Sequence, residues 1–257
     1  MAFPAEKAGT DVPVLRFEEI DSTNAEARRR AEAGEAGPLW IAARRQTAGR
    51  GRRGRAWETG AGNLAATLLT VVDKTPSEAA EIAFVAALAV GDLAAMHVPE
   101  TLVRLKWPND VLVDGRKVSG VLIESGRRDD GRLWLAVGVG VNLATPPVAS
   151  ERPATSFKDH LRPDLAAPLA PDAALTELSR AFTRWVQVWT TFGFDPIRDA
   201  WSARAELGRP CVARLDHETV EGLAEALEAD GALRLRLADG SARRITAGDV
   251  FFPGEPR

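Results

Sequence analysis

The dipeptide Asp114-Gly115 constrains the fold of this chain more than any other local feature, because it separates two runs of strand-forming residues. Asp-Gly readily adopts the positive φ angles of a tight hairpin turn, so the flanking apolar runs pair as antiparallel strands. The pattern predicts strands at residues 111–114 and 116–124, joined at this turn. Part of the molecule is therefore an antiparallel sheet.

The spacing of apolar residues predicts the remaining strands and helices. A helix is expected to begin at Thr23, because Thr23 and Glu26 have the spacing of a capping box, and to end near Gly34 or Gly37. Together the elements predict an α+β chain. Further helices are predicted at residues 76–96, 171–192 and 196–207, and further strands at residues 14–20, 39–43, 64–72, 103–107 and 133–143.

The last fifty residues differ from the rest of the chain. After Gly208 the pattern changes to short strands, with turns at Asp230-Gly231 and Asp239-Gly240. We therefore expect one domain at residues 1–208 and a small β-domain at residues 209–257.

The composition argues against several classes of protein. The chain has 33 basic and 36 acidic residues and a net charge of −3, so it is not adapted as a whole to nucleic acid or to a membrane surface. No stretch approaches the ~20 apolar residues of a membrane helix, and the N-terminus lacks the apolar core of a signal peptide. These features predict a cytoplasmic protein. The single Cys211 precludes an internal disulfide, and His97, His160 and His217 lack metal-ligand spacing, so no metal site is predicted.

Residues 44–55 read RRQTAGRGRRGR, with six arginines and no acidic residue. Arginine presents paired planar donors that match phosphate and carboxylate oxygens, and glycine lets the backbone approach a ligand closely. The run therefore favours a loop that closes over an anion, and we call residues 49–55 the arginine loop. A solvated basic loop and an RNA-binding segment are alternatives. The lack of aromatic interleaving and of a wider basic face counts against RNA binding.

The arginine loop also satisfies the dinucleotide pattern G-x-G-x-x-G through Gly49, Gly51 and Gly54. That pattern requires a helix to begin immediately after it. The following residues 55–60 instead read as a turn, so a dinucleotide-binding loop is not expected.

A second group of polar residues lies around the predicted hairpin. The segment Lys106-Trp107-Pro108-Asn109-Asp110 precedes it, and Lys117 lies on its second strand. Strand alternation predicts that Lys117 shares a face with Ser119, Val121 and Ile123 and points into a pocket if that face is covered. An exposed lysine beside a turn, and simple turn chemistry at residues 109–110, are the alternatives.

Taken in order, these motifs resemble the biotin–protein ligases. The arginine loop is similar to the biotin-binding loop of that family, and the KWPND segment and the Lys117-x-x-Gly120 spacing are further hallmarks. Residues 21–24, DSTN, and 138–142, GVGVN, also fit. The resemblance is strong over residues 14–145 and weaker to the C-terminus. It implies a class II aminoacyl-tRNA-synthetase-like catalytic domain, with a mixed sheet and flanking helices, followed by a small SH3-like barrel.

The resemblance also implies roles for individual residues. Lys117, Arg52 and Asp110 are the implied catalytic residues, with Lys117 pairing with the biotin carboxylate. Asp110 is our hypothesis for the group that positions the acceptor lysine or takes its proton. The implied biotin-binding residues are Ser22, Thr23, Asn24, Gln46, Gly49, Arg50, Gly51, Arg52, Lys117, Gly120, Gly138 and Gly140. The implied ATP-binding residues are Arg52, Arg53, Arg55, Trp57, Lys106, Asn109 and Asn142, with Trp57 near the adenine.

In such a ligase, ATP and Mg²⁺ activate biotin as biotinyl-5′-AMP, and the biotinyl group then passes to a lysine of a biotin carboxyl carrier domain. The resemblance further implies a homodimer and, because about a dozen residues precede the first predicted strand, an enzyme without DNA-binding or repressor function. A lipoate or octanoate ligase of similar fold is the nearest alternative. A nucleic-acid-binding protein and a non-catalytic biotin sensor are others.

Overall fold

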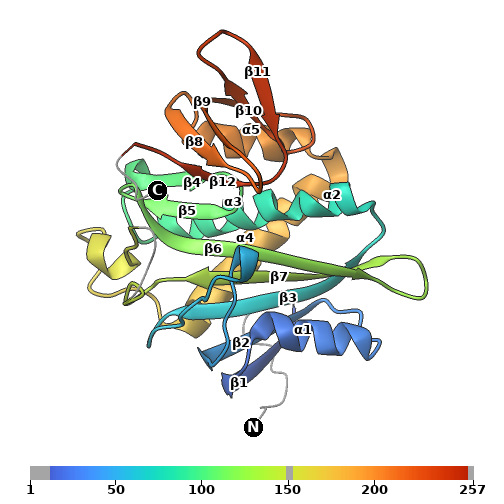
Figure 1. Cartoon of the computed structure of the whole chain (residues 1–257). Helices are drawn as coiled ribbons and strands as arrows, with labels where there is room; N and C mark the ends of the chain where they lie inside the picture. The colour runs from blue at the N-terminus through green and yellow to red at the C-terminus, as the bar shows by residue number, and fades with distance from the viewer. Residues whose placement is uncertain (1–11, 149–152, 254–257) are drawn as a thin grey trace.

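The computed structural model describes residues 12–148 and 153–253. Residues 1–11, 149–152 and 254–257 lie outside the described residues. They include the N-terminal segment, in which no signal peptide was expected, and the outer ends of both predicted domains. The described chain forms two sheets (Figure 1). The larger sheet has the order β1-β2-β3-β7-β6-β5-β4. Its strands are β1 (Val14–Ile20), β2 (Leu39–Gln46), β3 (Leu64–Val72), β4 (Val103–Lys106), β5 (Asp110–Val113), β6 (Arg116–Arg127) and β7 (Leu133–Val141).

The predicted hairpin is confirmed as the β5–β6 pair. Asp114 and Gly115 both have positive φ, 52° and 70°, as a tight hairpin turn requires. The edge strand β1 runs parallel to β2, whereas the other neighbouring strands of this sheet are antiparallel. The sheet is therefore mixed, as the sequence predicted.

Strand β7 shows how the sheet separates two environments. Its odd-numbered residues from Leu133 to Val141 belong to the main hydrophobic core, whereas Trp134 and Ala136 belong to a second, smaller core under α1 (Thr23–Glu32). Gly138 and Gly140 continue the even-numbered face beyond the end of this smaller core. Because strand side chains alternate, this glycine-bearing face is the one on which α1 begins.

The other long helices cover the opposite face of the sheet (Figure 1). The single helix predicted at residues 76–96 is two helices in the structure. They meet at Glu81, where two successive i→i−3 hydrogen bonds, Glu81 N to Glu78 O and Phe84 N to Glu81 O, tighten the backbone. The helices on this face are α2 (Pro76–Ala80), α3 (Ile82–Ala95), α4 (Pro171–Phe192) and α5 (Asp195–Arg204), and short 3₁₀ turns occur at η1 (Arg52–Gly54), η2 (Glu100–Leu102) and η3 (Phe157–His160).

Helix α1 begins at Thr23, as predicted, but its capping residue differs from the one that the capping-box spacing implied. Ser22, not Thr23, is the N-cap, and its Oγ accepts a hydrogen bond from Ala25 N at 3.4 Å. This shift leaves Thr23 and Asn24 in the first helical turn, where both are 4% exposed. Glu26 does not complete a capping box and instead pairs with Arg29 and Arg30.

The C-terminal strands form a five-stranded antiparallel sheet of order β11-β10-β9-β8-β12. The sheet agrees with the small SH3-like domain that the resemblance implied, but it is not a closed barrel, because β11 and β12, at its two edges, do not pair with each other. The short β12 lies beside the arginine loop, whose side chains bond to Gly248 O and to the Asp249 carboxylate. The strands are β8 (Pro210–Arg214), β9 (Thr219–Leu227), β10 (Leu233–Arg236), β11 (Ala242–Ile245) and β12 (Asp249–Phe251).

The C-terminal sheet is attached to the larger sheet through a loop contact. Trp107 is 4% exposed and donates from Nε1 to Gly231 O at 3.0 Å, which ties the β4–β5 connection to the turn before β10. Within the described residues, no helix is long and apolar enough to cross a membrane.

Candidate active site

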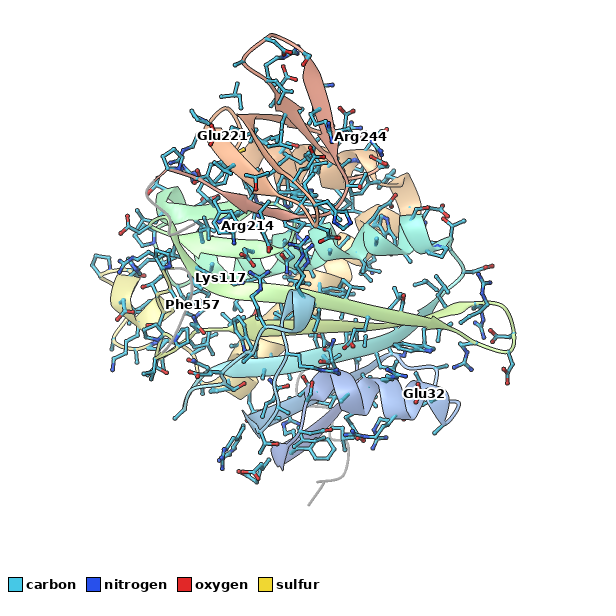
Figure 2. The ribbon with its side chains drawn as sticks, in the orientation of Figure 1. Glu32, Lys117, Phe157, Arg214, Glu221 and Arg244 are labelled. Carbon is cyan, nitrogen blue, oxygen red and sulfur yellow. The ribbon has the colours of Figure 1, made fainter. Side chains whose placement is uncertain are left out.

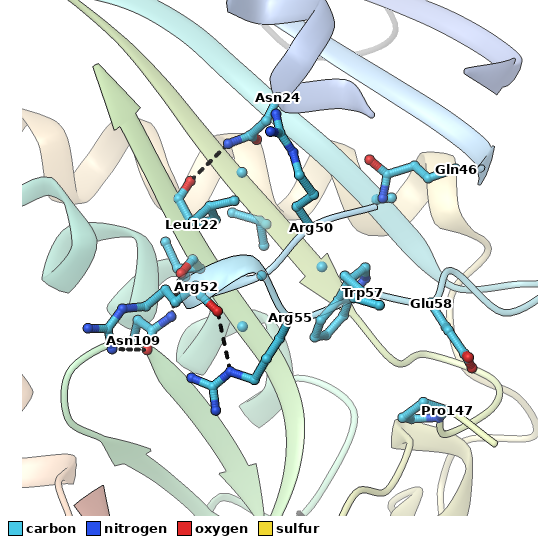
Figure 3. Close-up of a pocket in the computed structure, with 18 of the residues that line it drawn as sticks. Asn24, Gln46, Arg50, Arg52, Arg55, Trp57, Glu58, Asn109, Leu122 and Pro147 are labelled. Carbon is cyan, nitrogen blue, oxygen red and sulfur yellow. Dashed lines mark hydrogen bonds between the residues drawn. The ribbon is translucent and has the colours of Figure 1, made fainter. Parts of the chain in front are cut away.

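A cavity of about 380 Å³ lies on the glycine-bearing face of the larger sheet, between the start of α1, the arginine loop and β12. Its size is within the range of small-molecule sites, about 300–1,000 Å³. Residues distant in the sequence line it, from Ser22 to Asp249. Figure 3 labels several of them, between Asn24 and Pro147. Two parts of its wall differ in chemistry. We call Ser22, Thr23, Asn24 and Gln46 the α1 end, and Arg52, Arg55, Asn109 and Asp249 the arginine end.

Neutral hydrogen bonds organise the α1 end. Gln46 Oε1 accepts from the backbone N of Thr23 at 2.8 Å and from its hydroxyl at 3.1 Å, and Gln46 Nε2 donates to Thr59 Oγ1 at 3.1 Å. The hydroxyl of Thr67, which is fully buried on β3, lies 2.8 Å from Thr23 Oγ1 and 2.7 Å from Asn24 Oδ1. Buried polar groups that are satisfied in this way keep one arrangement.

The glycines of β6 and β7 make room for side chains that cross the floor of the cavity. A Cβ at Gly138 would overlap Asn24 Oδ1, and a Cβ at Gly140 would overlap the Trp57 ring. Gly120 pairs with Gly140 across the strands, and a Cβ there would lie 3.1 Å from Lys117 Nζ. Gly138 thus belongs to the α1 end, whereas Gly120 and Gly140 form the floor under Trp57.

The arginine loop folds back on itself. Arg50 and Ala56 form an antiparallel bridge, Gly51 N donates to Arg55 O at 2.7 Å, and Trp57 N donates to Gly49 O at 2.9 Å. The tip is the 3₁₀ turn η1, in which Arg53 has a φ of 55°. No α-helix follows Gly54 in this part of the structure, so the loop lacks the helix start that a dinucleotide-binding loop requires.

Asp249 of β12 forms ion pairs with the arginines at the tip of the loop. Its carboxylate accepts from Arg55 Nη2 at 2.8 and 3.0 Å and from Arg53 Nη1 at 3.4 Å, and Arg52 Nη1 lies 4.0 Å away. Arg52 Nη1 also donates to Asn109 Oδ1 and to Gly248 O, each at 3.3 Å. Burial lowers the pKa of the Arg52 guanidinium from its usual value, while the charges of Asp249 and Asp110 oppose that shift.

Lys117 lies between the two ends, on the main sheet below the C-terminal sheet (Figure 2). Its Nζ is 2.6 Å from Asp110 Oδ1 and 5.8 Å from the centre of the Trp57 ring. The Asp110 side chain is 5% exposed and that of Lys117 is 25% exposed. The cavity therefore holds a cation whose counter-ion in the ligand-free chain is a buried carboxylate.

The alternation argument placed Lys117 in a pocket but on the wrong face. Val111 pairs with Ser119 and Leu112 with Lys117, so Val118 is an extra residue on β6. This bulge moves Lys117 to the side of Gly120, whereas Val118 and Val121 are part of the main core.

A short segment beyond the sheet fixes the backbone around Lys117. Lys117 N donates to Pro153 O and Thr155 N donates to Lys117 O, both at 2.9 Å. Asn142, which is 2% exposed, donates from Nδ2 to Thr155 O at 3.1 Å. Asn142 and residues 153–155 therefore support Lys117 from the side opposite to β5.

Most of the residues implied by the family resemblance come together in this cavity. Three do not line it: Gly49, Arg53 and Lys106. Gly49 lies at the base of the loop against Trp57 O, and Lys106 Nζ lies 5.8 Å from the ring centres of Phe251 and Phe252. The implied residues that line it are Ser22, Thr23, Asn24, Gln46, Arg50, Gly51, Arg52, Arg55, Trp57, Asn109, Asp110, Lys117, Gly120, Gly138, Gly140 and Asn142.

Sequence reasoning missed four polar residues of the site: Glu58, which lines the cavity, and Thr67, Glu124 and Asp249. Thr67 had a weak signal, since it is a polar residue within an apolar strand. Glu124, whose Oε2 accepts from Asn24 Nδ2 at 2.7 Å, lies on the same face of β6 as Gly120 and Leu122. Asp249 gave no local signal. Within residues 12–148 and 153–253, no three His, Cys, Asp or Glu side chains are grouped as a metal site.

The comparisons with known proteins agree with this geometry. A family model described as the biotin/lipoate A/B protein ligase family matches residues 16–142, and one described as the biotin protein ligase C terminal domain matches residues 207–252. The fold and the site thus define the class, a protein ligase of the biotin/lipoate type.

Relatives define the family more narrowly. The biotin–[acetyl-CoA-carboxylase] ligase of Paracoccus denitrificans is 43% identical over 91% of this chain and 98% of its own length. That of Mycobacterium tuberculosis is 32% identical over 89% of this chain and 85% of its own. The biotin protein ligase of Aquifex aeolicus, solved in complex with biotin and ATP, has the same fold, with a TM-score of 0.73 at 24% identity over 93% of this chain and 97% of that one. The chain belongs to the biotin protein ligase family.

Proposed function

We propose that this chain is a biotin–protein ligase, which activates biotin with ATP and transfers it to a lysine of a biotin carboxyl carrier domain. The observation that carries the proposal is one cavity in which a neutral hydrogen-bonding end and a cluster of arginines lie on either side of Lys117. Biotin offers a neutral ureido ring at one end and a carboxylate at the other, and ATP offers phosphates. The order of chemical groups along the cavity therefore matches the order in the two substrates.

At the α1 end, Ser22, Thr23, Asn24 and Gln46 supply donors and acceptors for the ureido ring. Gly138 leaves the space in which Asn24 lies beside the floor of the cavity. Arg50 and Gly51 cover the ring from the arginine loop, and Gly49 fixes the base of that loop.

In the first step, a biotin carboxylate oxygen attacks the α-phosphorus of ATP, the bond from that phosphorus to the bridging oxygen breaks, and pyrophosphate leaves. Both reactants are anionic, so fixed positive charge lowers the barrier. Lys117 releases Asp110 and pairs with the biotin carboxylate, while Arg52 and Arg55 face the phosphates. The remaining nucleotide contacts that we propose come from Trp57, Asn109, Asn142, Arg53 and Lys106, the last two from outside the cavity lining.

In the second step, the amine of an acceptor lysine attacks the carbonyl carbon of the mixed anhydride and AMP leaves. Lysine has a pKa of about 10.4, so it must lose a proton before it attacks. Asp110, freed from Lys117, positions that amine or accepts its proton.

Mg²⁺ chemistry also belongs to this proposal. Magnesium usually binds through substrate phosphates and one or two carboxylates rather than in an all-protein cage. Asp110, beside Lys117, and Asp249, beside Arg55, are two carboxylates of the cavity lining. A magnesium ion bound to ATP would add positive charge to that of the arginines.

Biotin is favoured over lipoate or octanoate as the substrate of this fold. The relatives reported above are biotin ligases, and the match at residues 207–252 is to the C-terminal domain of that same group. We further propose a cytoplasmic homodimer, with β1 as the exposed edge strand of the larger sheet, and domains at residues 1–208 and 209–257.

The test is to incubate the protein with biotin, Mg-ATP and a purified biotin carrier domain and to probe the carrier with streptavidin. We expect labelling that requires ATP and the carrier's acceptor lysine. If the carrier were labelled with lipoate instead, as detected by mass spectrometry, the chain would be a lipoate ligase. Biotin binding without any ATP-dependent labelling would indicate a biotin sensor.

A further inference from the structure

Glu124 connects two parts of the site that are far apart in the sequence. It lies near the end of β6, and its side chain is 28% exposed. Oε2 accepts from Asn24 Nδ2 at 2.7 Å, and Oε1 lies 3.6 Å from Arg50 Nη2. One carboxylate thus contacts the first turn of α1 with one oxygen and the arginine loop with the other.

The contact with Asn24 fixes the orientation of that amide. Asn24 Nδ2 has two hydrogens, and both are used, on Glu124 Oε2 at 2.7 Å and on Leu122 O at 3.3 Å. Its Oδ1 accepts from the Thr67 hydroxyl at 2.7 Å. Asn24 therefore offers a ligand an acceptor and no free donor, and Glu124 is part of the reason.

The contact with Arg50 separates this side chain from the rest of the arginine loop. Arg52, Arg53 and Arg55 converge on Asp249, whereas Arg50 points toward Asn24 (Figure 3). The loop is therefore attached at both sides of the cavity, to β12 at its tip and to β6 at Arg50.

We propose that Glu124 is a positioning residue that holds the arginine loop closed at the α1 end and sets the amide of Asn24. This inference rests on the proposed function, because it assigns Glu124 to the retention of biotinyl-5′-AMP. The carboxylate acts through Asn24 and Arg50 and takes no part in bond making.

Two substitutions separate the two contacts. Glu124→Gln keeps an oxygen that can accept from Asn24 but removes the charge that attracts Arg50. We expect the adenylate to dissociate about two- to fivefold faster, as the loss of a partly exposed ion pair allows, with the KM for biotin unchanged. Glu124→Ala also removes the acceptor of Asn24, so the KM for biotin should rise about tenfold in addition.

Arg50→Gln should reproduce the faster dissociation of Glu124→Gln, and the double variant should be no worse than either single one. Glu18→Gln is the matched control, because Glu18 lies 3.5 Å from Arg44 in an exposed ion pair outside the site. That control should leave both the dissociation rate and the KM at wild-type values.

Adenylate dissociation is measured by chasing preformed, radiolabelled biotinyl-5′-AMP, beside steady-state KM values and melting temperatures. If Glu124→Gln and Arg50→Gln both retain the adenylate as the wild type does, the inference is overturned, whatever their melting temperatures. Additive effects in the double variant would also overturn it. If Glu124→Gln does not fold, Glu124→Ala carries the test, because Arg50 also lines the cavity and its loss alone cannot report on Glu124. Failure of the wild type to form any adenylate would refute the proposed function, and this inference with it.

Discussion

The two ends of the cavity are built in different ways. At the α1 end, hydroxyl and amide groups on α1, β2 and β3 bond to one another, and Thr23, Asn24 and Thr67 are at most 4% exposed. At the arginine end, Arg52, Arg53 and Arg55 surround the carboxylate of Asp249, which belongs to the other sheet and lies at least 194 residues further along the chain.

The difference indicates different tasks. A hydrogen-bonded network of buried hydroxyl and amide groups keeps one geometry, which suits the recognition of a ring. A cluster of arginines held by one carboxylate has a positive charge in excess, which suits a site where phosphates arrive and leave. In this account Asp249 orders the arginines before the nucleotide binds, and the C-terminal sheet contributes to the site through it.

The largest expected effect is that of Lys117→Ala, because Lys117 lies where both ends meet. Removal of a group that stabilises the developing charge costs about 10²–10³ in rate. We expect that loss in biotin-dependent ATP–pyrophosphate exchange, measured below the melting temperature of the variant. Exchange at the wild-type rate would remove Lys117 from the mechanism.

Substitutions at the glycines of β7 test the difference between the two ends most directly. Gly138→Ala would press on Asn24 and should raise the Kd for biotin, whereas Gly140→Ala would press on Trp57 and should raise the Kd for ATP. Overpacking of this kind typically costs about 1–3 kcal/mol, which corresponds to roughly fivefold to 150-fold weaker binding. Isothermal titration of each ligand measures both effects. If the two variants weakened both ligands equally, the division of the cavity would be wrong.

Asp249→Asn tests whether the C-terminal sheet sets the arginine end. Removal of this carboxylate should raise the KM for ATP about tenfold, as the loss of buried charged hydrogen bonds suggests, and leave the Kd for biotin unchanged. Asp216→Asn is the control, because Asp216 bonds to Arg53 at 2.7 Å but its side chain is 73% exposed. An equal effect of the two substitutions on the KM for ATP would show that Asp249 does not order the arginine end.

The smallest effect concerns Asp21, which precedes α1. Its hydrogen bonds to Arg29, at 2.8 and 2.9 Å, lower the pKa of Asp21 from 3.8 to about 2. A carboxyl group with a lowered pKa stabilises the folded protein above the unfolded pKa and loses that contribution as the pH falls toward the folded value. Both side chains are about half exposed, so Asp21→Asn should cost less than about 1 kcal/mol at pH 7.

Thermal unfolding of wild type and Asp21→Asn between pH 7 and pH 2 checks this. The difference in melting temperature should shrink below about pH 4, and binding of biotin at pH 7 should be the same for both. A marked loss of biotin binding would mean that the α1 end depends on this surface pair.

The local features of the fold were predictable from the sequence because their causes are local. The turn at Asp114-Gly115 and the strand predicted at residues 133–143 depend on neighbouring residues, and both are found in the structure. The division of the helix at Glu81 and the bulge at Val118 were missed, since they come from packing and register rather than from composition.

The site residues that belong to family motifs were predictable from the sequence. The residues that reach the site through long-range contacts were not. Nothing near Asp249 or Glu124 in the sequence indicates that one will meet Arg55 and the other Asn24. These contacts join residues that are 194 and 100 positions apart. Such pairs follow from the packing of the two sheets and of α1, which a single sequence does not display.

The most direct test of the central claim is biotin-dependent ATP–pyrophosphate exchange by the wild-type protein without any carrier domain. If the two ends of the cavity bind biotin and ATP side by side, labelled pyrophosphate should enter ATP only when biotin is present, and lipoate and octanoate should not replace it. Exchange that requires no biotin, or that proceeds equally with octanoate, would contradict the account.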